Sequence, residues 1–198
     1  MQEASSTLFT IAKDVKIQME FNPQTVSAYR LIGYETRKLN REDFNNDKVD
    51  AGEIGAGHTV TAIYEITPVG RDGGLVGPLR YQTEKSKKAP VPASEYGFLK
   101  LRYKLPNENK SKLIETPVRV ADSLESLESA PQDVRFATAV AAYAQLLRGG
   151  KYTGSYSYDD VIKLALSAKG RDTYGYRSEF INLVRLAGST AGMKPNGN

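Results

Sequence analysis

The sequence predicts an α+β protein, with an antiparallel β-sandwich over residues 1–120 followed by a small three-helix subdomain over residues 121–198. In the first part, apolar and polar side chains alternate with a period of two, and turn residues separate the runs without intervening helices. In the second part the apolar spacing lengthens to that of an α-helix. With 198 residues, 40% of them hydrophobic and 25% charged, the chain has the composition of one globular domain or two small ones.

Alternation places the strands of the first part in order along the chain. Pro23 ends the second strand, because proline cannot donate a hydrogen bond to a neighbouring strand. A turn over residues 107–110 should make the last two strands antiparallel neighbours. A short further strand is expected near residues 79–82. The main strands are expected at residues 7–12, 15–21, 26–32, 59–66, 98–104 and 113–120.

Three helices are expected after a polar linker over residues 121–129. The first runs from Pro131 to Gly149, with proline in its first turn and glycine just past its end. Ser157 is placed to cap a second helix over residues 158–168. A third is expected over residues 176–186, and the small polar residues after Gly188 predict a disordered tail.

Composition excludes several classes of site. There is no cysteine, which excludes disulfides, thiolate metal sites and cysteine nucleophiles. No apolar run approaches the roughly 18 residues that a membrane-spanning helix requires. The first six residues lack the charged and apolar regions of a signal peptide, and a strand pattern begins at Thr7, so we expect the chain to be a piece of a longer protein.

The net charge of +4 comes largely from a basic run over residues 80–104. Seven cations there (Arg80, Lys85, Lys87, Lys88, Lys100, Arg102 and Lys104) face only Glu84 and Glu95. A nucleic-acid surface would use such a run, but no motif of a nucleic-acid-binding fold accompanies it. We therefore expect a solvated loop and strand edge, and no nucleic-acid partner.

Several segments carry a family resemblance. They include Phe9–Gln18, Tyr29–Glu35, Arg135–Tyr143 and Ser157–Val161, together with an acidic loop at residues 42–58 that leads into the strand expected at residues 59–66. Together these segments resemble the C-terminal region, of no assigned function, of a bacterial family of von Willebrand factor type A domain proteins. The resemblance implies an upstream A domain and an envelope location reached through an N-terminal signal, both outside this chain.

The metal site of a type A domain uses an Asp-x-Ser-x-Ser motif. The nearest sequence in this chain, Asp122–Ser126, has its serine at the wrong offset. The metal chemistry of the A domain therefore cannot be assigned to any residue of this chain.

The acidic loop suggests a calcium site as an alternative. Its oxygen-bearing residues at the one-three-five spacing of a calcium loop are Asp43, Asn45 and Asp47. Lys48 then stands where that motif needs glycine, and Ile54 stands where it needs glutamate, with Glu53 one residue early. We expect a polar connection in which Asp and Asn side chains accept hydrogen bonds from turn amides.

A hydrolase based on carboxylates is a second alternative. It would require Glu35, Asp43 and Glu53 to converge in one pocket. His58, the single histidine, has no evident nucleophile beside it in the sequence, and a structural or surface role is expected. We therefore assign no catalytic, cofactor-binding or metal-binding residue, and we expect the protein not to be an enzyme.

A carbohydrate-binding module is the third alternative, because tyrosines cluster late in the chain at Tyr152, Tyr156, Tyr158, Tyr174 and Tyr176. Exposed rings would favour this function, whereas buried rings would indicate packing between helices. The preferred hypothesis is a non-catalytic accessory module at the cell envelope. Its partners would be the upstream type A domain of the same polypeptide and an unidentified protein.

Overall fold

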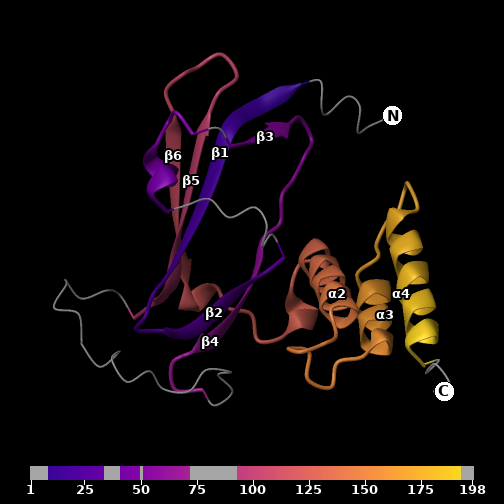
Figure 1. The fold of residues 1–198 in the computed structure, drawn as a ribbon. Helices are drawn as coiled ribbons and strands as arrows, with labels where there is room; N and C mark the ends of the chain where they lie inside the picture. The colour runs from indigo at the N-terminus through magenta and orange to yellow at the C-terminus, as the bar shows by residue number, and fades with distance from the viewer. Residues whose placement is uncertain (1–8, 34–40, 50, 72–92, 193–198) are drawn as a thin grey trace, which may run out of the picture. The chain divides into compact units, whose positions relative to one another are not determined.

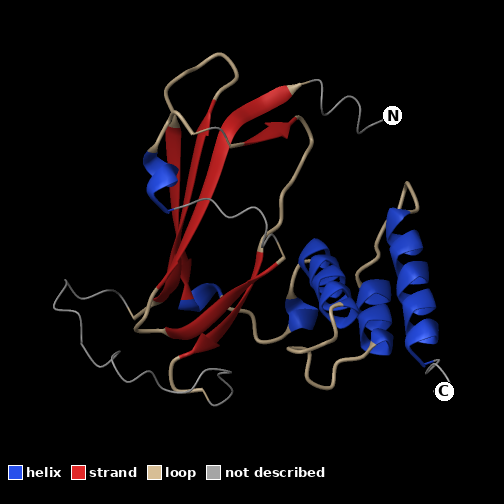
Figure 2. Ribbon diagram, in the orientation of Figure 1, coloured by secondary structure: helices blue, strands red, loops and turns tan. Residues whose placement is uncertain are grey.

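The structure is a computed structural model that describes residues 9–33, 41–49, 51–71 and 93–192. It divides into two units, Met1–Ser123 and Leu124–Asn198 (Figure 1). Strands occur in the first unit and the three α-helices in the second (Figure 2). The predicted α+β class, antiparallel sheets followed by three helices, is confirmed.

The first unit contains a four-stranded antiparallel sheet in the order β3-β1-β5-β6. Its strands are β1 (Thr10–Phe21), β3 (Gly52–Gly55), β5 (Glu95–Lys104) and β6 (Lys112–Arg119). The predicted antiparallel pairing of the last two strands is confirmed, with Leu101 opposite Ile114. Strand β3 lies inside the segment that was expected to be loop, so that part of the prediction is wrong.

Strand β1 is continuous where two strands were predicted. The change of register between Lys13 and Lys16 is taken up by a bulge that contains Asp14. Asp14 has a φ of 52°, a left-handed conformation that aspartate tolerates better than most residues. The bulge lets one strand pair with β5 along most of its length.

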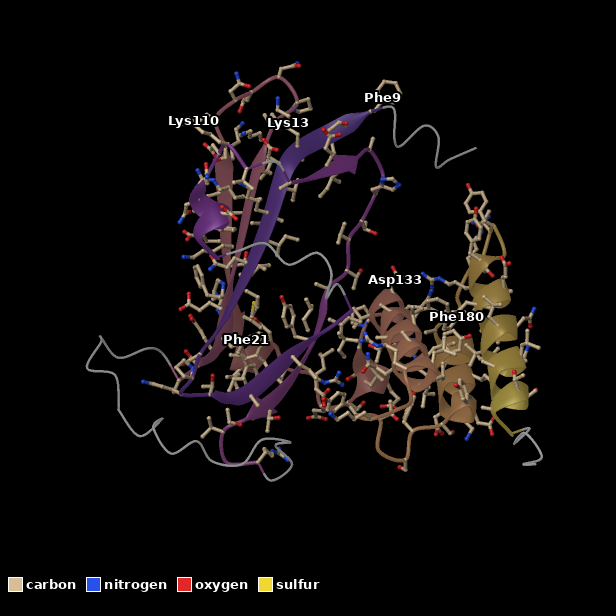
Figure 3. The ribbon with its side chains drawn as sticks, viewed as in Figure 1. Phe9, Lys13, Phe21, Lys110, Asp133 and Phe180 are labelled. Atoms are coloured by element: carbon tan, nitrogen blue, oxygen red, sulfur yellow. The ribbon has the colours of Figure 1, made fainter. Side chains whose placement is uncertain are left out.

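A second, two-stranded antiparallel sheet consists of β2 (Val26–Ile32) and β4 (Ile63–Pro68). The prediction for β2 is confirmed, whereas β4 begins four residues later than predicted because residues 59–62 have no ladder partner in the described part of the chain. The Phe21 ring at the end of β1 lies 4.3 Å from the ring of Tyr29 and 5.2 Å from that of Tyr64, so it joins the two sheets (Figure 3). The strand expected near residues 79–82 lies outside the described residues.

The short 3-10 helix η2 (Val120–Asp122) lies at the end of the first unit. The second unit begins within the predicted linker and starts with the short 3-10 helix η3 (Leu127–Ser129). Its helices are α2 (Gln132–Leu147), α3 (Tyr158–Ser167) and α4 (Tyr176–Gly192). The predicted Ser157 cap is confirmed as a reciprocal pair of hydrogen bonds with Asp160. The buried core of this unit is Ala139, Val161, Ala165, Ile181 and Val184.

Helix α4 continues to Gly192, so the prediction of a disordered tail after Gly188 is wrong for residues 189–192. Packing against α3 outweighs the weak helix propensity of this sequence, in which serine and threonine hydroxyls bond within the helix. Glycine at position 188 lets α4 approach Tyr158 closely, since an added Cβ would lie 3.2 Å from the Cβ of that tyrosine. The hydroxyls of Ser189 and Thr190 donate to carbonyl oxygens one turn earlier. Residues 193–198 lie outside the described part of the chain.

Candidate functional site

The acidic loop contacts β1 through a buried lysine. Lys16 is only 3% exposed. Its ammonium donates to the carbonyl oxygen of Asp43, 3.1 Å away, and to that of Asn46. The alternation predicted that Lys16 lies on the solvent-exposed face of its strand, and this prediction is wrong. The 3-10 helix η1 (Arg41–Asn45) and the turn after it cover this face and supply carbonyl acceptors to the lysine. Ile17, expected on the buried face, is 44% exposed.

A second buried lysine completes this polar network. Lys104 is 8% exposed, and its ammonium lies 2.6 Å from Asp14 Oδ2 and 2.8 Å from the carbonyl oxygen of Asp47. The Asp47 carboxylate accepts hydrogen bonds from Ser111 Oγ at 2.8 Å and from Arg102 Nε at 3.2 Å. The Ser111 hydrogen bond, helped by the charge of Arg102, holds the pKa of Asp47 below its ordinary value.

This network bears on the calcium alternative. Carbonyl oxygens of the acidic loop receive lysine ammonium groups, so lysine side chains supply the positive charge that a calcium ion would bring. Among the described residues, no three acidic, histidine or cysteine side chains gather closely enough to hold a metal ion. In the described structure the acidic loop is thus a connection held by hydrogen bonds to the sheet.

The structure describes two of the three carboxylates of the hydrolase alternative, Asp43 and Glu53, and neither belongs to a cluster of three acidic or histidine side chains among the described residues. Glu53 lies on β3, where its carboxylate accepts a 3.3 Å hydrogen bond from Thr10 Oγ1. Glu35 lies outside the described residues. His58 is exposed after β3, and its backbone N–H donates to the carbonyl oxygen of Gly55 at 3.1 Å.

The described cations of the basic run are paired inside the sheet unit. Lys100 lies 4.0 Å from Glu115 on the neighbouring strand, Arg102 binds Asp47, and Lys104 binds Asp14. The prediction of a solvated edge is wrong for Lys104, because β5 is a central strand between β1 and β6. Arg80, Lys85, Lys87 and Lys88 lie outside the described residues.

Tyr156 and Tyr158 are engaged in packing, and the exposed Tyr152 contacts a lysine. The ring of Tyr158 meets that of Tyr143 edge-on at 6.3 Å. The Tyr156 hydroxyl donates to the Asp160 carbonyl oxygen at 3.4 Å, and its pKa is raised by burial and by the Asp160 charge. The ammonium of Lys151 lies 5.1 Å from the centre of the Tyr152 ring. These rings do not form an open platform.

Tyr174 and Tyr176 differ from the other three. They are 62% and 67% exposed, and their ring centres lie 6.1 Å apart with a 32° angle between the ring planes. The left-handed Gly175 between them, with a φ of 76°, allows the turn that places both rings on one side of the loop. The alternating Tyr-Gly-Tyr sequence was visible in the chain, but nothing in the sequence separated these two rings from the packed ones.

The two rings border an open hollow of about 490 Å³ in the helical unit. Its walls come from the start of α2, the loop at residues 171–174 and the start of α4. Asp133 on α2 lies 2.6 Å from the Arg177 guanidinium on α4, which ties the two helices together beside the hollow (Figure 3). The same guanidinium donates to the carbonyl oxygens of Ala168 and Lys169 and lies 4.7 Å from the centre of the Phe136 ring.

Asp172 fixes the entry of the chain into α4. Its carboxylate accepts from the backbone N–H groups of Arg177 and Ser178, at 3.2 and 2.8 Å, and from Ser178 Oγ at 2.7 Å. Together these bonds hold the pKa of Asp172 below its ordinary value, and the bond from the Ser178 hydroxyl contributes most. Arg171 beside it is exposed and makes no ion pair with any described residue. The hollow thus combines exposed rings, fixed polar groups and one cation without a counter-ion.

Comparison with known proteins places the chain in a family. The family model described as "Uncharacterized protein YfbK, C-terminal" matches residues 6–190. The uncharacterized protein YfbK of Escherichia coli is 43% identical over 185 residues, which are 93% of this chain and 31% of that protein. The chain therefore spans about a third of the length of this relative. No solved structure matches the chain.

No helix in the described part of the chain is long and apolar enough to cross a membrane. The resemblance inferred from the sequence, to a C-terminal region of no assigned function, agrees with the family match and with the partial coverage of the longer relative. This chain belongs to the family of the C-terminal region of the uncharacterized protein YfbK.

Proposed function

We propose that this chain is a non-catalytic interaction module that lies C-terminal to a von Willebrand factor type A domain and binds that domain at the bacterial cell envelope. The single observation that carries the proposal is the outward face of α4. The type A domain and the envelope location come from the sequence resemblance, and the α4 face supplies the surface through which the contact would form.

Helix α4 exposes large apolar groups on the side opposite its core. Ile181 and Val184 are buried against α3, whereas Tyr176, Leu183 and Leu186 are 67%, 50% and 66% exposed. Spacings of seven and three residues put these exposed side chains on one stripe of the helix, which also carries the exposed Glu179 between Tyr176 and Leu183. Large apolar groups exposed on one face of a helix, with polar groups among them, are typical of a surface that binds another protein.

The composition of this stripe suits a protein interface. Tyrosine is enriched among the residues that contribute most to binding, because it buries a large area at a small entropic cost. Removing apolar surface from water contributes roughly 25 cal/mol per Å². The polar side of the same helix, where Arg185 donates to Asn182 at 3.0 Å, would remain in water at the rim of the contact.

A calorimetric titration with the separately produced type A domain tests this function. We expect saturable binding by the unaltered chain. For Leu183→Asp we expect at least a tenfold loss of affinity, because the new charge would be buried in the interface that this stripe forms on binding. Leu166→Asp on α3 is the matched control, because Leu166 and Leu183 are both 50% exposed. Absence of binding by the unaltered chain, or an equal loss from both variants, would exclude this function.

Carbohydrate binding is a second candidate function, and the exposure of Tyr174 and Tyr176 favours it. Aromatic rings in sugar-binding sites stack on the apolar faces of sugar rings while nearby polar groups bond the hydroxyls. Binding of any oligosaccharide that is lost in Tyr174→Ala would support this candidate, and retention of binding in that variant would count against it.

A further inference from the structure

We propose that the hollow beside Tyr174 and Tyr176 binds acidic oligosaccharides, meaning glycans whose sugar units carry carboxylate groups. The inference rests on the second candidate function and names its ligand class. It combines the ring pair, the polar groups of the hollow and the Arg171 guanidinium, which has no ion-pair partner among the described residues.

The ring pair gives the site its apolar contact. Both rings border the hollow and are more than 60% exposed, with ring centres 6.1 Å apart and a 32° angle between the ring planes. Two neighbouring exposed rings suit sugar units, whose C–H faces contact aromatic rings. The Asp172 cap holds the backbone at the start of α4, next to the segment that carries the rings.

Fixed polar groups around the hollow suit sugar hydroxyls. The Gln132 side chain lies against Gly170. A Cβ added at position 170 would lie 1.9 Å from Gln132 Nε2, so a larger residue there would displace the Gln132 amide. The Asp133 carboxylate is held by Arg177 at 2.6 Å and keeps a second oxygen as an acceptor. Carboxylate and amide groups held in this way can accept from and donate to the hydroxyls of one sugar unit.

Charge distinguishes acidic from neutral glycans. Asp133 forms an ion pair with Arg177. The Asp172 carboxylate stays ionised, but its oxygens accept hydrogen bonds from the first turn of α4, and the Lys169 charge acts on it as well. Arg171 then provides a guanidinium with no described counter-ion at the edge of the hollow. A planar guanidinium binds a carboxylate through two parallel hydrogen bonds, which would favour uronic-acid units over neutral sugars.

The test compares three probes by calorimetry: trigalacturonic acid, its neutral methyl ester and a triglutamate peptide. We expect the acid to bind at least about fivefold more tightly than the ester, as one charge-assisted contact predicts. Tyr174→Ala and Tyr176→Ala should each remove binding. Arg171→Gln should lower the affinity for the acid to that for the ester. Tyr152→Ala, which changes a tyrosine engaged with Lys151, is the matched control and should bind normally.

Each other outcome overturns the proposal in a distinct way. Equal binding of acid and ester would exclude the preference for acidic glycans and leave carbohydrate binding intact. Binding of neither would remove both. Triglutamate binding as tightly as the acid would identify the hollow as a site for acidic peptides. Loss of binding in Tyr152→Ala equal to that in Tyr174→Ala would show that the site lies elsewhere. Circular dichroism of each variant checks its fold.

Discussion

Replacing Lys16 with methionine removes the ammonium that joins the acidic loop to strand β1, while an apolar chain of similar length stays in place. The carbonyl oxygens of Asp43 and Asn46 then lose their donor. An acceptor left without a partner away from water costs about 1–3 kcal/mol. Asn46 is on the exposed side of the loop, where water can replace the lysine, so only the Asp43 carbonyl is left without a partner and we expect a loss of about 1–3 kcal/mol.

Urea denaturation, followed by the NMR intensities of β1 and β5 amides, measures this loss in the sheet unit separately from the helices. Lys100→Met is the matched control, since Lys100 makes a 4.0 Å surface ion pair with Glu115 and lies 5.8 Å from the centre of the Phe98 ring. Such a pair contributes about 0–1 kcal/mol. If Lys16→Met loses no more stability than Lys100→Met, the Lys16 ammonium does not hold the acidic loop to β1. Stabilisation of the unaltered chain by added calcium would also contradict this contact, because that ion would compete for the same carbonyl oxygens.

Three further predictions concern the packing and the capping of the fold. Gly97→Ala should destabilise the sheet unit by about 1–3 kcal/mol in the same urea assay, because the new Cβ would lie 2.5 Å from the Glu20 carbonyl oxygen; unchanged stability would contradict this close approach. Ile181→Ala should cost the helical unit about 2–5 kcal/mol, and Leu186→Ala on the exposed face of the same helix under about 0.5 kcal/mol; similar losses would show that the core is assigned wrongly. Because the pKa of Asp172 is lowered, its contribution to the free energy of unfolding is complete above its ordinary pKa of 3.8 and is lost as the pH falls through the lower folded value. In acid titrations, the stability of Asp172→Asn should therefore depend less on pH than that of the unaltered chain. Identical curves would contradict the cap.

The periodicity of the sequence was sufficient for much of the fold. The alternation around Leu101 and Ile114 identified two neighbouring strands, and Ser157 marked the start of a helix because its capping chemistry is local. Local signals of this kind depend on residues close in the chain, so one sequence reveals them.

Interactions between distant segments account for the errors. The pattern around Lys16 indicated a wet face, but the acceptors that bury this lysine come from residues 27 and 30 positions later. Strand β3 is too short to show alternation, and it exists because β1 offers it a partner. In the candidate site, Arg171 and Asp133 were not singled out, because they are about 40 positions apart in the chain and border the same hollow only in the folded helical unit.

In the proposed function, the helical unit binds its partner through the outer face of α4. Hydrogen–deuterium exchange compares this chain alone with the longer polypeptide that includes the type A domain, and residues 176–192 are the segment to follow. The proposed function predicts slower exchange in α4 of the longer polypeptide, with unchanged exchange in α3. Equal exchange of α4 in the two proteins would contradict it.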